Sequence, residues 1–132
     1  MNPQGMTVLA STHGPKVTVE RVIAAVERHG MAVLARVDHA AAATRVGMTL
    51  RPTEVLIFGN PKAGTPLMQD AQTIGIDLPL KVLVWQDDND RVWLAYNDPR
   101  WLAMRHGVSD AQDATLGVMT SMLAAVATEA AA

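Results

Sequence analysis

The chain has 132 residues, of which 49% are hydrophobic and 18% are charged, and its formal net charge is −2 at neutral pH. This length predicts a single domain with an ample core, and the charge balance argues against a nucleic-acid partner, which needs a concentrated basic face. The chain contains no cysteine, which excludes thiol catalysis, disulfides and thiolate metal sites.

From its first residues we expect the chain to have no targeting signal. Residues 1–5 have neither the basic start nor the apolar stretch of a signal peptide. No apolar run approaches the roughly 20 residues that span a bilayer. We therefore expect a cytoplasmic protein with no membrane partner.

Strands and helices are predicted to alternate in the first half of the chain. Residues 6–11 predict a strand that ends at a His-Gly-Pro breaker. A helix should follow Thr18 as its N-cap, because apolar side chains recur at the spacing of one helical face. Residues 32–37 alternate as a strand does, and Asp38 can cap a short helix over residues 39–46.

The middle of the chain predicts a buried strand, a helix and a hairpin. Residues 53–58 are apolar on both faces, which is typical of a central strand. Thr65 can cap the next helix, with a proline at the first helical position. Residues 78–85 and 91–96 predict an antiparallel hairpin in which two tryptophans face each other.

Two helices complete the pattern. Asp98 opens a short helix that ends at Gly107, and Ser109 with Gln112 forms a capping box for the last one. One stripe of that helix is apolar: Leu116, Met119, Leu123 and Val126. We predict one α+β domain over residues 1–132, with helices on one face of a mainly antiparallel sheet and a C-terminal helix over about residues 110–129.

Five segments carry a family resemblance. They are Asp38-His39-Ala40, residues 50–54 (LRPTE), residues 58–61 (FGNP) with 64–68 (GTPLM), residues 77–82 (DLPLKV) and, more weakly, residues 96–99 (YNDP). In these segments the chain resembles the prokaryotic family called domain of unknown function 302. The resemblance implies an α+β fold similar to the TATA-box-binding-protein-like class, often as a dimer, and it implies no established reaction. It covers about residues 6–107, so the last helix is expected to be peripheral.

The turn Gly59-Asn60-Pro61 is the first candidate site. Asn60, Lys62 and the backbone N–H groups around Gly64 and Thr65 would bind a carboxylate or phosphate at a helix start. A structural turn explains the same residues, because asparagine bonds to the backbone two residues on and proline fixes the chain direction. Gly59 and Gly64 have the spacing of the glycines in a phosphate-binding loop. The next residues are Thr-Pro, where that loop has Lys-Ser/Thr, which excludes a nucleotide triphosphatase.

His39 is the second candidate. It could act as an acid/base catalyst with Asp38 or Asp77, although Asp38 is equally explained as an N-cap. No histidine pair has metal-binding spacing, so we expect no metal site; His39 with Asp77 and a methionine is the one conceivable set. No cofactor is indicated.

From these observations we rank three possible functions. A non-catalytic module that binds a small polar or anionic ligand near Asn60, acting as a homodimer, comes first. A structural or interaction domain follows, dimerising through a sheet edge or the last helix. An enzyme of unknown class using His39 with an orienting Asn60 comes third.

Overall fold

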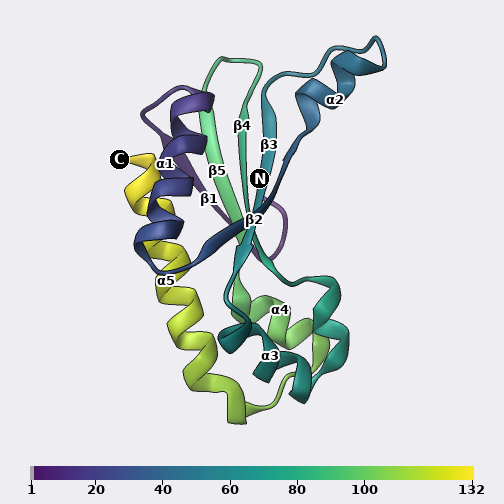
Figure 1. The fold of residues 1–132 in the computed structure, drawn as a ribbon, viewed down its shortest axis with the longest axis vertical. Coiled ribbons are helices and arrows are strands. Elements are labelled where there is room, and N and C mark those ends of the chain that lie inside the picture. Colours follow the sequence, from purple (N-terminus) through teal and green to yellow (C-terminus); the bar gives the residue numbers. More distant parts are fainter. Residues whose placement is uncertain (1) are drawn as a thin grey trace.

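The computed structural model describes residues 2–132 and confirms the α+β class. One antiparallel sheet has the strand order β1-β5-β4-β3-β2 (Figure 1). Its strands are β1 (Met6–Ser11), β2 (Ala32–Asp38), β3 (Thr53–Gly59), β4 (Leu80–Gln86) and β5 (Val92–Asn97). The helices are α1 (Pro15–Arg28), α2 (His39–Arg45), α3 (Pro61–Asp70), α4 (Pro99–His106) and α5 (Asp113–Ala131), with two short 3₁₀ turns, η1 (Gln72–Ile76) and η2 (Asp110–Gln112).

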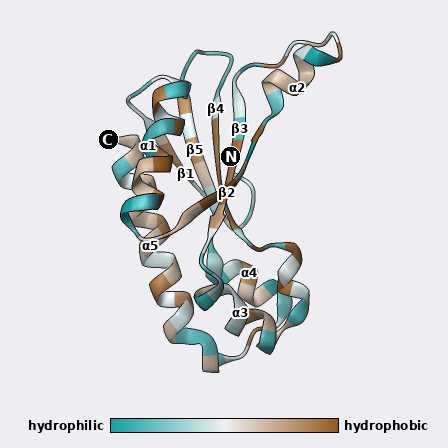
Figure 2. Ribbon diagram, in the orientation of Figure 1, coloured by the Kyte–Doolittle hydropathy of each residue, from teal (hydrophilic) through white to brown (hydrophobic). Residues whose placement is uncertain are grey.

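The core lies between the sheet and two helices. Helices α1 and α5 run beside each other in Figure 1 and contact the sheet. The strands are largely hydrophobic in Figure 2. Fully buried side chains come from both layers: Val22, Val26, Leu56, Phe58, Val82, Leu94, Leu123 and Val126. Burying each such side chain contributes about 1.5–3 kcal/mol, so this layer accounts for most of the stabilisation.

The opposite face of the sheet is less well covered. The strand register places Val8, Val37, Val55, Leu83 and Ala95 in one row across all five strands. In this row Ala95 is buried, whereas the other four side chains are partly or substantially exposed. The predicted tryptophan pair lies on the same face and is confirmed by the pairing of β4 with β5. This face is apolar without being fully buried.

Helix α1 begins earlier than the sequence predicts. Its N-cap is Gly14 and its first residue is Pro15, so the proposed cap, Thr18, lies inside the helix. Thr18 is completely buried, and its hydroxyl lies 2.7 Å from that of Ser11. Pro15 favours a helix that begins at its own position, because the fixed φ of proline already matches a helix. This preference outweighs the tendency of Thr18 to act as an N-cap.

Helix α3 also begins earlier, and this matters for the site. Asn60 is its N-cap and Pro61 its first residue, which leaves Pro66 inside the helix. The prediction that Thr65 caps this helix was therefore wrong. Two cap-plus-proline pairs stand five residues apart in the sequence, and the first one starts the helix.

The last helix forms part of the core. Its predicted apolar stripe is confirmed, since Leu116, Met119, Leu123 and Val126 are all buried. The capping box is not formed: the Ser109 hydroxyl bonds the carboxylate of Asp70 at 2.5 Å. Contrary to our expectation from sequence, the segment Asp110–Ala131 is long and apolar enough to cross a bilayer by length and composition. Core helices share these properties, and here the buried stripe packs inside the domain.

Candidate functional site

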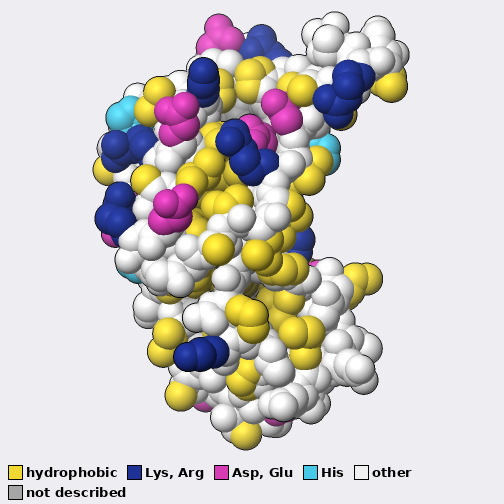
Figure 3. Space-filling view, in the orientation of Figure 1, with side chains coloured by type: hydrophobic (Ala, Val, Ile, Leu, Met, Phe, Trp, Pro, Cys, Tyr) yellow, Lys and Arg dark blue, Asp and Glu magenta, His cyan; other side chains and the backbone are white. Residues whose placement is uncertain are grey.

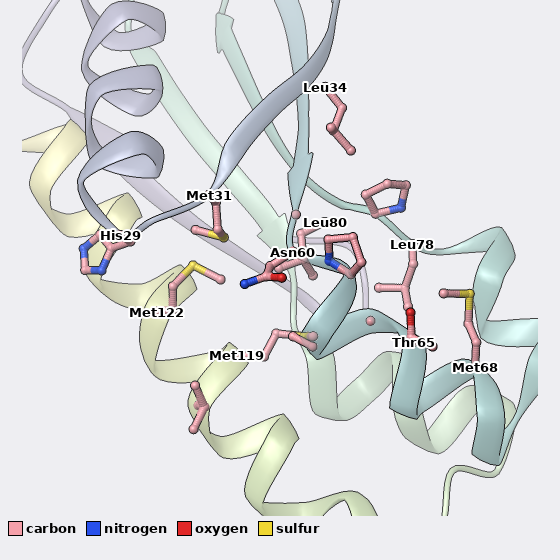
Figure 4. Close-up of a pocket in the computed structure, with 16 residues that line it drawn as sticks. His29, Met31, Leu34, Asn60, Thr65, Met68, Leu78, Leu80, Met119 and Met122 are labelled. Carbon is pink, nitrogen blue, oxygen red and sulfur yellow. The ribbon is translucent and has the colours of Figure 1, made fainter.

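A cavity of about 470 Å³ lies where the sheet meets α3 and α5 (Figure 4). Figure 3 shows hydrophobic side chains gathered in the hollowed middle of the molecule, between the part formed by the sheet and the part formed by α3 and α4. Four methionines line the cavity: Met31, Met68, Met119 and Met122. Its polar side chains are those of His29, Asn60 and Thr65. The walls are therefore mostly apolar, with a few polar groups.

The Gly59-Asn60-Pro61 turn forms one wall of this cavity. Strand β3 ends at Gly59, and the Oδ1 atom of Asn60 accepts a hydrogen bond from the backbone N–H of Lys62 at 3.0 Å. The backbone carbonyl of Asn60 accepts from Ala63 at 2.9 Å and from Gly64 at 3.2 Å. Pro61 has no N–H. Every donor in the first turn of α3 is therefore already used.

This arrangement fixes the orientation of the Asn60 amide. Because the Lys62 N–H is a donor, the atom that caps it must be the oxygen, and the other terminal atom is the nitrogen Nδ2. Figure 4 shows this nitrogen directed toward Met31 and Met122. Within residues 2–132 neither it nor the Thr65 hydroxyl has a hydrogen-bond partner in the protein.

The structure brings together part of the first predicted site. Asn60, Gly64 and Thr65 line the cavity, whereas Lys62 is exposed outside it. The expected free N–H groups around Gly64 are not available, because the helix begins at Pro61 and encloses them. The turn thus has its structural role, and the Nδ2 donor of Asn60 has no hydrogen-bond partner among residues 2–132.

The second predicted site is not assembled. In the strand register, Asp38 at the end of β2 lies opposite Glu54, near the start of β3. Asp77 comes before β4, and Leu80, the first residue of β4, lies opposite Phe58 near the other end of β3. The two aspartates are therefore about 13 Å or more apart along the strand direction. His39 cannot use Asp77 or Asn60, and the metal set of His39, Asp77 and a methionine fails for the same reason. Asp38 caps α2 by accepting from the Ala41 N–H at 2.9 Å.

Asp77 instead belongs to a cluster that the sequence did not indicate. Its Oδ2 atom lies 2.5 Å from Nε2 of His106 and 2.8 Å from Arg105. The other ring nitrogen of His106, Nδ1, lies 2.9 Å from the hydroxyl of Thr73. The His106 side chain is only 9% exposed. The sequence suggested His106 only as a helix-end cation, since its partners are 29 and 33 residues away.

The charges in this cluster shift the pKa of Asp77. Burial acts to raise this pKa, but the hydrogen bond from His106 and the positive charge of Arg105 outweigh burial. The pKa of Asp77 therefore lies below its ordinary value, and the carboxylate stays charged at neutral pH.

A further ion pair stands at the rim of the cavity. Glu129 of α5 lies 2.6 Å from Arg28 and 3.2 Å from Nε2 of His29. The hydrogen bonds from Arg28 and then His29 lower the pKa of Glu129. Among the described residues, 2–132, no group of three or more histidine, aspartate or glutamate side chains is placed to hold a metal ion.

Known proteins resemble this chain over most of its length. It is 47% identical over 117 residues to proteins of Brucella suis and Brucella abortus that are both named "Fluoride-specific ion channel FluC 1". The match covers 89% of this chain but only 46% and 43% of those proteins. The chain thus spans less than half the length of these relatives.

The chain also matches a solved structure and a family model. The crystal structure of an uncharacterized conserved DUF302 protein from Bacillus stearothermophilus has the same fold, with a TM-score of 0.85 at 19% identity over 97% of this chain and 99% of that one. The family model "Domain of unknown function DUF302" matches residues 7–126, which takes in much of α5 beyond the expected residues 6–107. The chain therefore belongs to the DUF302 family.

Proposed function

We propose that this protein is a non-catalytic binding module that holds a small molecule in the cavity beside the Gly59-Asn60-Pro61 turn. The observation that carries the proposal is an apolar cavity of about 470 Å³ whose wall presents an amide donor without a protein partner. Ligand pockets are typically about 300–1,000 Å³, with apolar walls and a few polar groups that orient the ligand.

The lining favours binding over catalysis. Of the described residues that line the cavity, His29 alone has a titratable side chain, and its Nε2 atom is engaged by Glu129. Acid/base chemistry needs a positioned proton donor or acceptor, and usually a partner that orients it toward the substrate. His29 stands at the rim with its Nε2 atom against Glu129, and among the described residues no second titratable side chain lines the cavity to work with it.

Native mass spectrometry of freshly purified protein, paired with a thermal-shift screen, tests this function. We expect a retained small molecule or a compound that raises the melting temperature. A Cβ at Gly64 makes only ordinary contacts, at 3.8 Å from Leu78 and 3.9 Å from Met68, so Gly64→Leu should fold and fill the cavity. Gly64→Leu should abolish binding, whereas the control Ala124→Leu, at an exposed position of α5, should not. A screen without any hit, equally silent for all three proteins, refutes the proposal.

We also propose that the protein is a homodimer formed through the β2 edge and the open face of the sheet. Strand β2 is an edge strand in which every residue except Val33 is exposed. Unpaired strand edges bind other strands readily, and the row of side chains containing Val37 and Leu83 adds apolar surface. Light scattering after size exclusion tests this, with Val37→Lys expected to give monomers and a monomeric wild type as the contrary result.

The alternative interface, the last helix, is less favoured. Its apolar stripe already packs inside the domain, so deleting residues 109–132 would unfold the protein and would not report on association.

We also propose that the protein is cytoplasmic and has no membrane partner. Cell fractionation tests it, and recovery in the membrane fraction would instead suggest that the protein works with a channel like those for which its relatives are named.

The Thr73-His106-Asp77 cluster supports a second candidate function, hydrolysis of activated esters. Asp77 accepts from Nε2 of His106, which leaves Nδ1 free to accept the Thr73 proton. The Thr73 oxygen would attack the ester carbonyl carbon, and His106 would pass the proton to the leaving alcohol. Water would then hydrolyse the acyl-threonine. Hydrolysis of p-nitrophenyl acetate should be slower in Thr73→Val than in the control Thr44→Val; equal rates in the two variants exclude this function.

A further inference from the structure

We infer that the ligand of the cavity is uncharged and largely apolar, and that it carries a hydrogen-bond acceptor, such as a ketone or amide carbonyl, which pairs with Nδ2 of Asn60. This inference rests on the proposed function and names its ligand class. It replaces the anionic ligand that the sequence suggested.

The cavity offers an anion no permanently charged cationic partner. Among residues 2–132 no lysine or arginine lines it, and the first-turn donors of α3 are consumed by the side chain and carbonyl of Asn60. His29, at the rim, is hydrogen-bonded to the carboxylate of Glu129. An anion placed against apolar walls without a paired charge loses its hydration and gains nothing equivalent.

A cation is disfavoured by the same reasoning. Of the side chains that the structure describes, no aspartate, glutamate, phenylalanine, tyrosine or tryptophan lines the cavity, so a cation would find there neither a carboxylate nor a favourable π face. The walls instead consist largely of methionine and leucine side chains. Methionine is unbranched and polarizable and adapts to irregular apolar shapes, so the walls favour an apolar body of variable outline.

The free donor then selects the head group. Nδ2 of Asn60 can only donate, because an amide nitrogen has no free lone pair, and the Oδ1 atom already accepts from the Lys62 N–H. A pure hydrocarbon would displace water from this donor and leave it unpaired, whereas a carbonyl oxygen would satisfy it. The hydroxyl of Thr65, on another part of the wall, can serve a second polar group. Thus one donor and an apolar lining together specify a neutral molecule with an acceptor.

The probes that test this inference share one chain length and differ in the head group. They are nonan-2-one, octanoate and octylammonium, each titrated into the protein at pH 7 and followed by calorimetry and by ligand-observed NMR. We expect nonan-2-one to bind at least about tenfold more tightly than either ion, because each ion lacks a charge partner in the cavity.

A matched variant isolates the donor. Asn60→Asp keeps an oxygen that caps Lys62 and keeps the side-chain shape, but it replaces the amide nitrogen with a second acceptor. Nonan-2-one should bind about tenfold or more weakly to Asn60→Asp, while octylammonium should gain affinity. Asn60→Ser, which also caps but is too short to reach the cavity, should lose nonan-2-one without gaining octylammonium. Lys62→Ala, outside the cavity, should bind nonan-2-one like the wild type.

The outcomes separate the ligand class from the function. Tightest binding of octanoate, lost in Gly64→Leu, overturns the inference and leaves the binding module standing. Equal affinity of nonan-2-one for the wild type, Asn60→Asp and Asn60→Ser overturns the role of Nδ2. If no probe binds and the broader screen of the proposed function is also silent, both fail.

Discussion

Two glycines with left-handed backbone conformations provide a matched test of packing in this fold. Gly107, which ends α4, has φ of 68°, and Gly5, before β1, has φ of 78°. Alanine at either position is strained by about 1–2 kcal/mol, because a Cβ crowds the backbone there. A Cβ at Gly107 meets no atom within 4 Å, so we expect Gly107→Ala to cost about 1 kcal/mol in free energy of unfolding.

Gly5→Ala should cost more, because its Cβ has no room. It would lie 2.5 Å from Cγ and 2.6 Å from Cε3 of Trp101, and closer still to Cδ2. Relief requires moving the indole ring or the turn, and the turn is held by a 2.8 Å hydrogen bond from the Asp98 N–H to the Gly5 carbonyl. Losing that bond adds about 1 kcal/mol and disturbed packing of the ring about 1 kcal/mol more. We therefore expect a total near 3 kcal/mol.

Urea unfolding followed by far-UV circular dichroism measures both variants without relying on Trp101 fluorescence. Thermal unfolding gives a second readout, because each kcal/mol lost in free energy of unfolding lowers the melting temperature of a domain of this size by about 4 °C. The melting temperature should therefore fall by about 12 °C for Gly5→Ala and by about 4 °C for Gly107→Ala. Equal losses, within about 0.5 kcal/mol, would show that the contact with Trp101 yields freely and would refute the reasoning.

Three other perturbations follow from the side-chain contacts. Asp77→Ala removes the partner of the buried His106 and should cost about 2 kcal/mol at pH 7 by urea unfolding. Because the pKa of Asp77 is lowered in the fold, its contribution is fully present above about pH 4 and is lost as the pH falls through the folded-state pKa, so the difference from wild type should shrink as the pH falls below about 4. Arg21→Met removes hydrogen bonds to the last carbonyls of α5, at 2.8 and 3.1 Å, and should cost about 1–2 kcal/mol; an unchanged urea midpoint would contradict this. Trp93→Phe removes the indole hydrogen bond that lowers the pKa of Asp87, so NMR titration should find that pKa closer to its ordinary value.

Much of the fold could be predicted from local patterns. Helical spacing identifies α1 and the buried stripe of α5, and the polar turn between two apolar runs identifies the hairpin of β4 and β5. These patterns suffice because each records which face of one element is buried. They do not choose between Asn60-Pro61 and Thr65-Pro66 as a helix start, since both obey the same capping rule.

The site was only partly predictable because it is made by distant segments. Asn60 could be identified from its turn, but the methionines of the cavity come from the loop just before β2, from α3 and from α5, and carry no common spacing. Likewise Thr73 and His106 meet only because α4 folds back onto η1. Whether the oxygen or the nitrogen of the Asn60 amide is free depends on where α3 begins. The sequence predicted that boundary wrongly, at Thr65.

The pairing of the first strand with the last has a consequence for how the protein is made. Strands β2 to β5 follow one another as neighbours, whereas β1 joins β5 across the chain, with Met6 opposite Asn97. Strand β1 therefore leaves the ribosome well before its partner and stays unpaired until β5 has been synthesised, and α5 must follow before the core closes. Such distant pairing makes folding slow, because a long loop must close before its contacts are gained. The apolar β1 is exposed to other chains throughout that interval, which makes it the segment at which aggregation during synthesis should begin.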